Sequence, residues 1–252
     1  MAPPSTHADA IAARLDGVVA LDLTVTATAW VLPGLKELRA HGDLSSFDPL
    51  AGQDLMVPAP LDDGRPRWRR YTVRRIDRAA GTLDLWVTTD SGGPGAKWAL
   101  DAKVGDAFEA VGPRGKVRID ETAATHVFVV DTAGLAAMCA MAEAIAAPAV
   151  VHTFALLEDA APQGSLALAT PVADSAVVST DPTGFLDEVR EHLAAAHVDP
   201  SATAGYVFAE LSVMRRASSL LAEAGIDPSR TAAKPYWRAG EPNEDHGEPN
   251  KS

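Results

Sequence analysis

A cluster of arginines around a tyrosine carries the clearest chemical signal in this sequence. Residues 65–78 read Arg-Pro-Arg-Trp-Arg-Arg-Tyr-Thr-Val-Arg-Arg-Ile-Asp-Arg, seven arginines in fourteen residues, in a chain of formal net charge −12. Guanidinium groups suit phosphate oxygens, and tyrosine offers a flat face to an aromatic ring. In a strand, Arg69 and Tyr71 share one face. The other face then carries Arg70, Thr72 and Arg74. This pattern favours a strand that holds a phosphorylated aromatic cofactor; the alternative is a solvated edge strand.

A glycine-rich segment follows this cluster. Residues 91–99 read Ser-Gly-Gly-Pro-Gly-Ala-Lys-Trp-Ala. Glycines let a backbone approach a ligand closely, and a helix that starts near Ala96 would offer free N–H groups to an anion, with Lys97 adding charge. A long hairpin loop is the alternative for this segment alone. Together, the two segments suit a flavin dinucleotide, because one could hold the ring and the other the pyrophosphate.

Composition sets the class of protein that must position these groups. With 252 residues and 47% hydrophobic residues, the chain can form one large domain or two of ordinary size. Its negative charge argues against nucleic-acid binding. Cys139 is the only cysteine, so an intrachain disulfide is excluded, which fits a reducing compartment. Residues 1–17 lack the pattern of a signal peptide, and no run reaches 18 apolar residues. We therefore expect a soluble, cytoplasmic protein without a membrane segment.

The pattern of the elements predicts two domains. Short strands separated by Gly/Pro turns favour an antiparallel β-barrel in the first half. The expected strands are 18–31, 54–57, 69–77, 82–89, 107–111 and 116–119. Strands alternate with helices in the second half, which predicts a parallel α/β domain. The expected strands there are 126–130, 150–157, 166–170 and 206–209, and the helices are 134–146, 184–196 and 211–224. We predict domains at 1–122 and 123–238 and a disordered tail at 239–252.

Five short motifs in this order resemble the siderophore-interacting protein family, which belongs to the ferredoxin-reductase-like flavoproteins. They are Arg-Arg-Tyr-Thr-Val-Arg at 69–74, Gly-Pro-Gly-Ala-Lys-Trp-Ala at 93–99, Gly-Asp at 105–106 with Gly-Pro-Arg-Gly at 112–115, Ala-Glu at 209–210 with paired arginines at 215–216, and Tyr-Trp-Arg-Ala-Gly at 236–240. The resemblance covers nearly the whole chain, from about 18 to 238. It implies a flavin-binding barrel followed by an NAD(P)H-binding domain.

The resemblance also implies which residues line the site. Arg69, Tyr71 and Thr72 would line FAD, and the loop from Gly93 to Ala96 would meet the pyrophosphate. The other candidate cofactor-binding residues are Arg74, Thr89, Gly95, Lys97, Trp98, Tyr236 and Trp237. Lys234 and Arg238 are candidates for attracting an anionic chelate or phosphate. The aromatic pair near the C-terminus has an alternative role as an anchor that pins the end of the chain to the core.

The implied activity is transfer of electrons from NAD(P)H through FAD to ferric siderophores, with release of ferrous iron. The implied partner is thus a small molecule, and no spacing of histidine and cysteine predicts a protein metal site. Where the family's second domain usually opens with Gly-Asp-Glu-Thr-Ala, residues 130–134 read Val-Asp-Thr-Ala-Gly. This departure leaves two other hypotheses open. One is a flavin- or siderophore-binding protein with a degenerate nicotinamide site, and the other is a biosynthetic flavoenzyme on the same scaffold.

Overall fold

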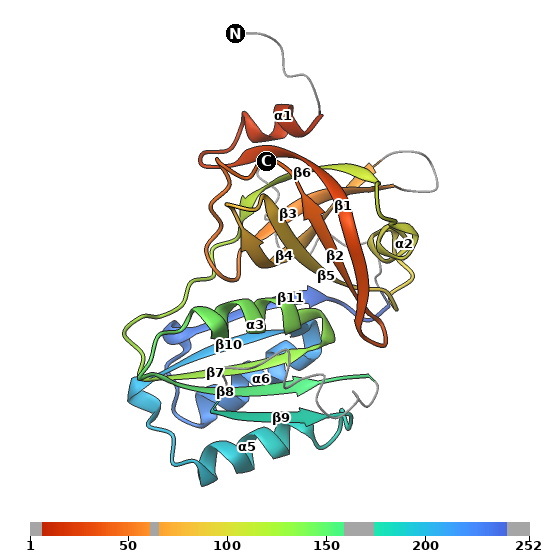
Figure 1. The fold of residues 1–252 in the computed structure, drawn as a ribbon. Helices are drawn as coiled ribbons and strands as arrows, with labels where there is room; N and C mark the ends of the chain where they lie inside the picture. The colour runs from red at the N-terminus through yellow and green to blue at the C-terminus, as the bar shows by residue number, and fades with distance from the viewer. Residues whose placement is uncertain (1–6, 61–65, 159–173, 241–252) are drawn as a thin grey trace. The chain divides into compact units, whose positions relative to one another are not determined.

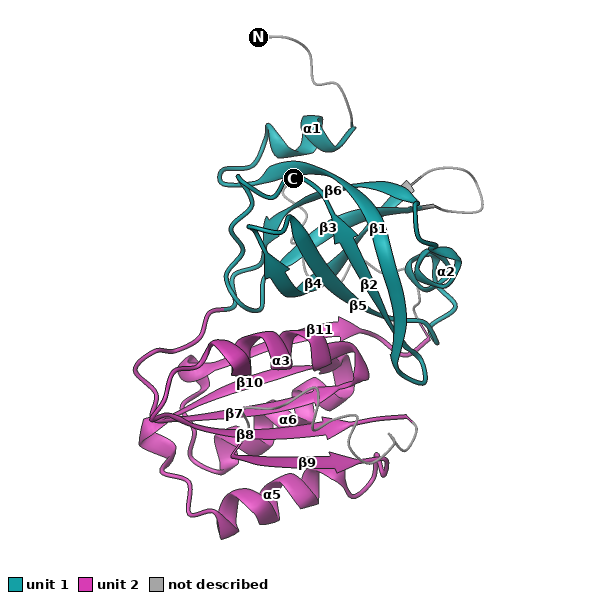
Figure 2. Ribbon diagram, viewed as in Figure 1, with its two compact units in different colours: residues 1–117 teal, residues 118–252 magenta. Residues whose placement is uncertain are grey.

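The chain forms two compact units, residues 1–117 and 118–252 (Figure 2). The computed structural model describes residues 7–60, 66–158 and 174–240. The predicted strand at 166–170 lies outside the described residues, as does all but the start of the predicted tail at 239–252. No helix in the described ranges has the length and the apolar character needed to cross a membrane.

The first unit is a closed barrel of antiparallel strands, in the order β1-β2-β5-β4-β3-β6 (Figure 1). This arrangement confirms the predicted barrel. Its strands are β1 (Val19–Leu32), β2 (Leu35–His41), β3 (Asp54–Pro60), β4 (Pro66–Asp77), β5 (Thr82–Thr88) and β6 (Ala107–Arg114), and its helices are α1 (His7–Ala12) and α2 (Pro94–Asp101). Alternating burial along β1, with Leu21, Leu23 and Val25 inside and Asp22 and Thr24 outside, is the period expected of a strand with one face in the core.

Strand β4 carries the arginine cluster and pairs on both sides, with β3 and with β5. The strand is part of a closed barrel, but its two neighbours pair with different halves of it: Pro66–Thr72 pair with β3, and Val73–Asp77 pair with β5. The pairing with β5 shifts register between Val73 and Arg75, which marks a bulge at Arg74. Because the bulge interrupts the alternation of faces, Thr72, Val73 and Arg74 are all buried.

The second unit is a five-stranded sheet in the order β11-β10-β7-β8-β9, and every strand pair is parallel. Its strands are β7 (Thr125–Asp131), β8 (Val150–Leu156), β9 (Ser175–Ser179), β10 (Thr203–Glu210) and β11 (Thr231–Trp237). Its helices are α3 (Leu135–Ala144), α5 (Phe185–Ala195) and α6 (Leu211–Glu223), with short 3-10 turns at Thr132–Gly134, Pro200–Ala202 and Pro228–Arg230. The predicted α/β class is confirmed.

Strand order in this sheet reverses between β7 and β10, and open α/β sheets bind ligands at the carboxyl ends of strands at such a point. Figure 1 shows α3 on one face of the sheet and α5 and α6 on the other. Leu186 and Val189 of α5 pack with Leu220 and Leu221 of α6 in one buried core. Strands β7 and β10 are buried along nearly their whole length, which explains their continuous apolar runs.

Several predicted elements need correction. No strand forms at Lys116–Ile119, because β6 already includes Gly112, Pro113 and Arg114 and the chain then leaves the barrel. The glycine-rich segment does contain the helix considered for it, starting at Pro94 rather than near Ala96. The sequence reading missed α1, β2, β9 and β11.

Candidate cofactor-binding site

The candidate site of the first unit lies where β4 meets the N-terminus of α2. A Cβ added to Gly95 would lie 2.2 Å from the Tyr71 hydroxyl oxygen and 3.5 Å from Cγ of Arg69. The two β4 side chains therefore share one face, as predicted, and this face meets the start of α2. Only a residue without a side chain lets the helix approach Tyr71 so closely.

The Tyr71 hydroxyl is buried and has no hydrogen-bond partner among the described residues. Its ring stacks on that of Trp98, with centroids 5.4 Å apart and planes at 21°, and Trp98 meets Phe108 edge to face. Burial raises the pKa of Tyr71 above its ordinary value, and the charge on Arg69 opposes this shift. The hydroxyl is thus a neutral donor that lacks an acceptor, and leaving such a group unsatisfied costs free energy.

The N-terminus of α2 adds further donors beside this hydroxyl. Gly93 is the N-cap and supplies no side-chain hydrogen bond, Pro94 has no N–H, and the Lys97 N–H donates to the Gly93 carbonyl. The amides of Gly95 and Ala96 are the remaining donors of the first turn, and neither has an acceptor in the described part of the chain. The helix dipole makes this end attractive to an anion.

Together, these groups fit the chemistry of a flavin dinucleotide. Two backbone amides and the Arg69 guanidinium suit phosphate oxygens, and the Tyr71 phenol and its ring suit an aromatic group with polar edges. The orphaned hydroxyl and the close contact at Gly95 are the structural observations on which this fit depends.

Other arginines of the cluster serve the fold. Arg70 makes a two-fold ion pair with buried Asp54, Nε to Oδ1 and Nη2 to Oδ2, each at 2.8 Å. Arg74, a candidate cofactor residue, is only 2% exposed, and its guanidinium lies 4.8 Å from the centre of the Trp86 ring. Arg78 pairs with Asp48 at 3.0 Å. The arginine cluster therefore does not form one large anion site. Several of its members contact different groups of the barrel instead.

The remaining candidates of the first unit take different positions. Thr72 and Thr89 are buried, and the Thr89 N–H donates to the Gly34 carbonyl at 2.8 Å. Lys97 is exposed on α2. Sequence reasoning missed Lys36 on β2, whose ammonium donates to three carbonyls at the C-terminal end of α2.

Asp131 organises the carboxyl edge of the sheet in the second unit. One carboxylate oxygen accepts the N–H groups of Ala133 and Gly134, at 2.9 and 3.2 Å. The other accepts the Glu210 N–H and the Trp237 indole N–H, both at 2.7 Å. One buried side chain thus joins the ends of β7, β10 and β11.

Burial and hydrogen bonds have opposite effects on the pKa values of the two carboxyl groups at this edge. Desolvation raises the pKa of Asp131 to about 6, against the lowering effect of its four donors. Desolvation also acts on Glu210, but hydrogen bonds from Ser212, Ala239 and Val213 outweigh it and bring the pKa below its ordinary value. The Glu210 carboxylate accepts the amides of Ser212 and Val213, so it caps the N-terminus of α6.

The aromatic residues predicted near the C-terminus lie on β11 or directly after it. Tyr236 stacks on Phe208 with centroids 5.7 Å apart, and the Lys234 ammonium lies 5.1 Å from the centre of the Tyr236 ring. Trp237 is 36% exposed and is anchored by Asp131, and the half-buried Arg238 follows it. The anchoring role considered for this pair is thus present, and it leaves part of the Trp237 ring accessible.

A serine between two histidines is a second feature that sequence reasoning missed. Ser175 Oγ lies 2.7 Å from Nδ1 of His152 and 2.9 Å from Nε2 of His192. The three residues come from β9, β8 and α5. Burial lowers the pKa of His152, the charge of His192 lowers it further, and Asp174 opposes both. Only the fold brings these residues together, since His152 and His192 are 40 positions apart.

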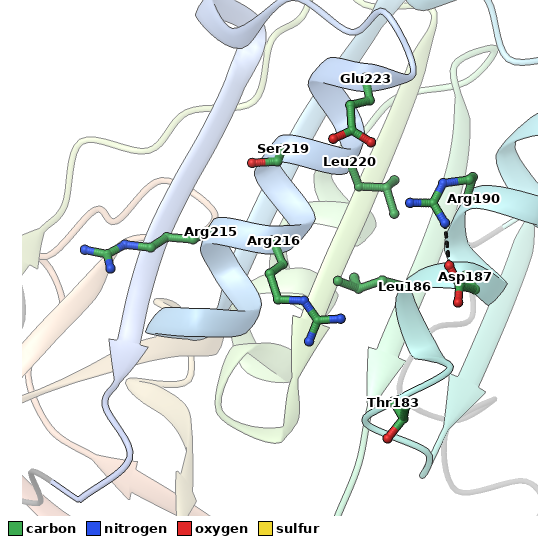
Figure 3. A pocket seen from close by; sticks show the side chains of 9 residues that line it. All are labelled: Thr183, Leu186, Asp187, Arg190, Arg215, Arg216, Ser219, Leu220 and Glu223. Atoms are coloured by element: carbon green, nitrogen blue, oxygen red, sulfur yellow. Dashed lines mark hydrogen bonds and ion pairs between the residues drawn. The ribbon is translucent and has the colours of Figure 1, made fainter.

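A hollow of about 340 Å³ lies between α5 and α6 (Figure 3). It is lined by Thr183, Leu186, Asp187, Arg190, Arg215, Arg216, Ser219, Leu220 and Glu223. Figure 3 shows Arg190 paired with Asp187 and Arg215 extending from α6 away from α5. The paired arginines of the fourth motif therefore do not act as one double-charged unit.

Comparisons with known proteins agree with this geometry. The family model "Siderophore-interacting FAD-binding domain" matches residues 40–117, and the model "Siderophore-interacting protein" matches residues 123–240. A ferric vibriobactin reductase of Vibrio cholerae is 28% identical over 146 residues, which is 54% of this chain and 54% of that protein. The chain thus matches about half the length of this curated relative.

Two solved structures show the same fold. A siderophore utilization protein from T. fusca has a TM-score of 0.70 and 24% identity, covering 91% of this chain and 97% of that one. The ferredoxin reductase of carbazole 1,9a-dioxygenase has a TM-score of 0.71 and 17% identity, covering 87% of this chain and 70% of that one. The fold is therefore ferredoxin-reductase-like.

Proposed function

The chain belongs to the siderophore-interacting protein family, and we propose on that premise that it is an FAD-dependent reductase of ferric siderophores. The observation that carries this proposal is the group of donors without acceptors at the start of α2. The amides of Gly95 and Ala96 and the buried Tyr71 hydroxyl meet there, beside Arg69.

Each residue has a distinct role in this proposal. The two amides and the Arg69 guanidinium bind the FAD phosphates, and Thr72 and Lys97 support them. Tyr71, held by its stack on Trp98, orients the flavin ring and donates its hydroxyl hydrogen to it. Bound there, FAD would supply the chemistry that accepts two electrons as hydride from NAD(P)H and passes one electron to each of two ferric ions.

Iron release follows from the chemistry of the substrate. Siderophores hold ferric iron in hard oxygen cages, and ferrous iron, with its lower charge, binds such oxygens less strongly. Reduction therefore weakens the chelate. Lys234 and Arg238 are the residues we propose to attract an anionic chelate, while Tyr236 and Trp237 shape the edge beside them. The vibriobactin reductase similarity and the family model support this substrate class.

One observation favours a second candidate, a flavin-binding protein that does not use nicotinamide nucleotides. The Asp131 carboxylate already accepts the amides of Ala133, Gly134 and Glu210 at the strand ends where α/β sheets bind nucleotide phosphates. A carboxylate there competes with phosphate for the same donors. Whether residues 130–134 can still bind a nicotinamide nucleotide therefore decides between the two candidate functions.

One anaerobic experiment tests both. The protein is loaded with FAD, and NADH or NADPH is added while the flavin absorbance is followed. The reductase proposal predicts bleaching, then reoxidation and ferrous-chelate colour when ferric siderophore and a ferrous trap are added. Flavin that binds but is not bleached by either nucleotide supports the second candidate. Bleaching without any ferrous signal contradicts the siderophore substrate.

A further inference from the structure

Lys36 occupies an unusual place for a charged side chain. It lies on β2, is 8% exposed, and its ammonium donates to the carbonyls of Ala99, Leu100 and Ala102 at 2.7, 3.1 and 3.2 Å. Within the described residues its partners are carbonyls alone. Burying an ammonium is costly, and an apolar side chain would fill this volume at lower cost. The ammonium is therefore explained by what it does to α2.

The three carbonyls form the C-terminal end of α2. A helix presents partial negative charge and unpaired carbonyls at this end, so a lysine there satisfies both. The helix has only eight residues, and its first turn has no side-chain cap. Isolated helices of this length are not stable in water, so the contacts at its ends and along its buried face fix its position.

The opposite end of the same helix carries the candidate phosphate donors. Gly95 and Ala96 are buried in the first turn, and Gly95 lies against Tyr71. Eight residues span about 12 Å, so a shift at the C-terminal end moves the N-terminal amides as part of one rigid rod. The Lys36 anchor therefore sets the distance between these amides and Arg69.

We propose that Lys36 is a positioning residue for the flavin phosphate site, which holds α2 so that the amides of Gly95 and Ala96 and the Arg69 guanidinium converge on one anion. This inference rests on the proposed function, since it concerns how the FAD site is built. It predicts that Lys36 matters more for the phosphate-bearing part of the cofactor than for the ring, which α2 affects only through Trp98 and its stack on Tyr71.

The test compares two flavins that differ in phosphate. Dissociation constants of FAD and of riboflavin, which has no phosphate, are measured by flavin fluorescence for the wild type and for Lys36→Met. We expect FAD affinity to fall about tenfold, the size of a lost hydrogen bond from a charged group, and riboflavin affinity to fall much less. Lys36→Arg, which keeps charge and donors, should recover most of the loss. Lys103→Met, which removes an exposed charge just after the same helix, should behave as wild type.

Each other result decides against the inference. If Lys36→Met binds FAD as the wild type does, Lys36 does not position the site. If both flavins weaken in parallel, or if circular dichroism shows that Lys36→Met is unfolded while Lys36→Arg binds both flavins weakly, the lysine serves the barrel as a whole. A wild type that binds no FAD overturns the proposed function itself, which distinguishes that failure from the failure of Lys36.

Discussion

At the scale of single residues, the site is marked by donors that lack acceptors. Most buried polar groups in proteins are hydrogen-bonded, so the unpartnered Tyr71 hydroxyl needs an explanation. Tyr206, which is also buried, provides the contrast, since its hydroxyl accepts the Asp120 N–H at 2.8 Å and lies 3.3 Å from His126 Nδ1. One tyrosine hydroxyl is satisfied by the fold, and the other has no hydrogen-bond partner in the described part of the chain.

This contrast predicts opposite outcomes for the same substitution. Tyr71→Phe should leave the melting temperature unchanged or raise it, because it removes an unsatisfied group, and should weaken FAD binding about fivefold, or ~1 kcal/mol. Tyr206→Phe should cost about 1 kcal/mol of stability and leave FAD binding unchanged. Thermal unfolding and FAD titration of both variants measure this. A Tyr71→Phe protein that loses stability but binds FAD normally would contradict the assignment.

Asp131 predicts a pH dependence of stability. Its pKa rises from an ordinary 3.8 to about 6 in the folded chain, so the folded state holds a proton that the unfolded state has lost between these values. Stability from this group is therefore complete below about pH 4 and is lost as the pH rises through 6. The unfolding free energy of the wild type should fall relative to that of Asp131→Asn over this range. The prediction is wrong if the free energy of unfolding of the wild type instead rises relative to that of Asp131→Asn as the pH increases.

At the scale of elements, single side chains join segments that are distant in sequence. Lys36 joins β2 to α2, Asp131 joins three strand ends, and Ser175 joins β8, β9 and α5. In each case a polar group on one element satisfies groups on another. The first contact fixes the position of α2 in the barrel, and the other two fix elements of the five-stranded sheet.

The serine between two histidines predicts a second pH effect. Because the fold lowers the pKa of His152, stability from this group is present above pH 6.5 and is lost as the pH falls below that value. His192 and Asp174 are the charged groups that act on it. His152→Asn should remove this acid sensitivity from urea unfolding curves, whereas His197→Asn, at an exposed position, should keep it. Equal acid sensitivity in the wild type and in His152→Asn would argue against this role.

Sequence patterns predicted the elements whose burial is regular and missed those defined by long-range partners. Strand β2 reads Leu-Lys-Glu-Leu-Arg-Ala-His, which is rich in charge for a strand. Its charged residues have partners on other elements: Arg39 pairs with Asp84, and Lys36 caps the C-terminal end of α2. Strand β11 contains Pro235, which argues against a strand, but β11 lies at the sheet edge, where proline is tolerated.

Some features of the candidate site were predictable from the sequence, and others were not. Alternation along β4 predicted that Arg69 and Tyr71 share a face, because period two holds before the bulge at Arg74. Lys36 and the bond from Trp237 to Asp131 were not predictable, since 63 and 106 positions separate the partners. Charge count also misled, because Arg70 and Arg78 pair with carboxylates from other segments.

At the scale of the whole molecule, the two units divide the chemistry between them. The barrel carries the donors that fit FAD, and the α/β unit carries the edge at which such sheets bind nucleotides. A chain of net charge −12 needs local positive groups to hold a dianionic cofactor, and Arg69 with the N-terminus of α2 supplies them. The account as a whole therefore depends on whether FAD binds at β4 and α2.

Titration of the purified protein with FAD tests this most directly, with Arg69→Ala compared with Arg75→Ala, an exposed arginine on the same strand. The account predicts one FAD per chain in the wild type, an affinity about tenfold to a hundredfold lower in Arg69→Ala, and wild-type affinity in Arg75→Ala. A wild type that binds no FAD, or an Arg69→Ala variant that binds it as tightly as the wild type does, would contradict it.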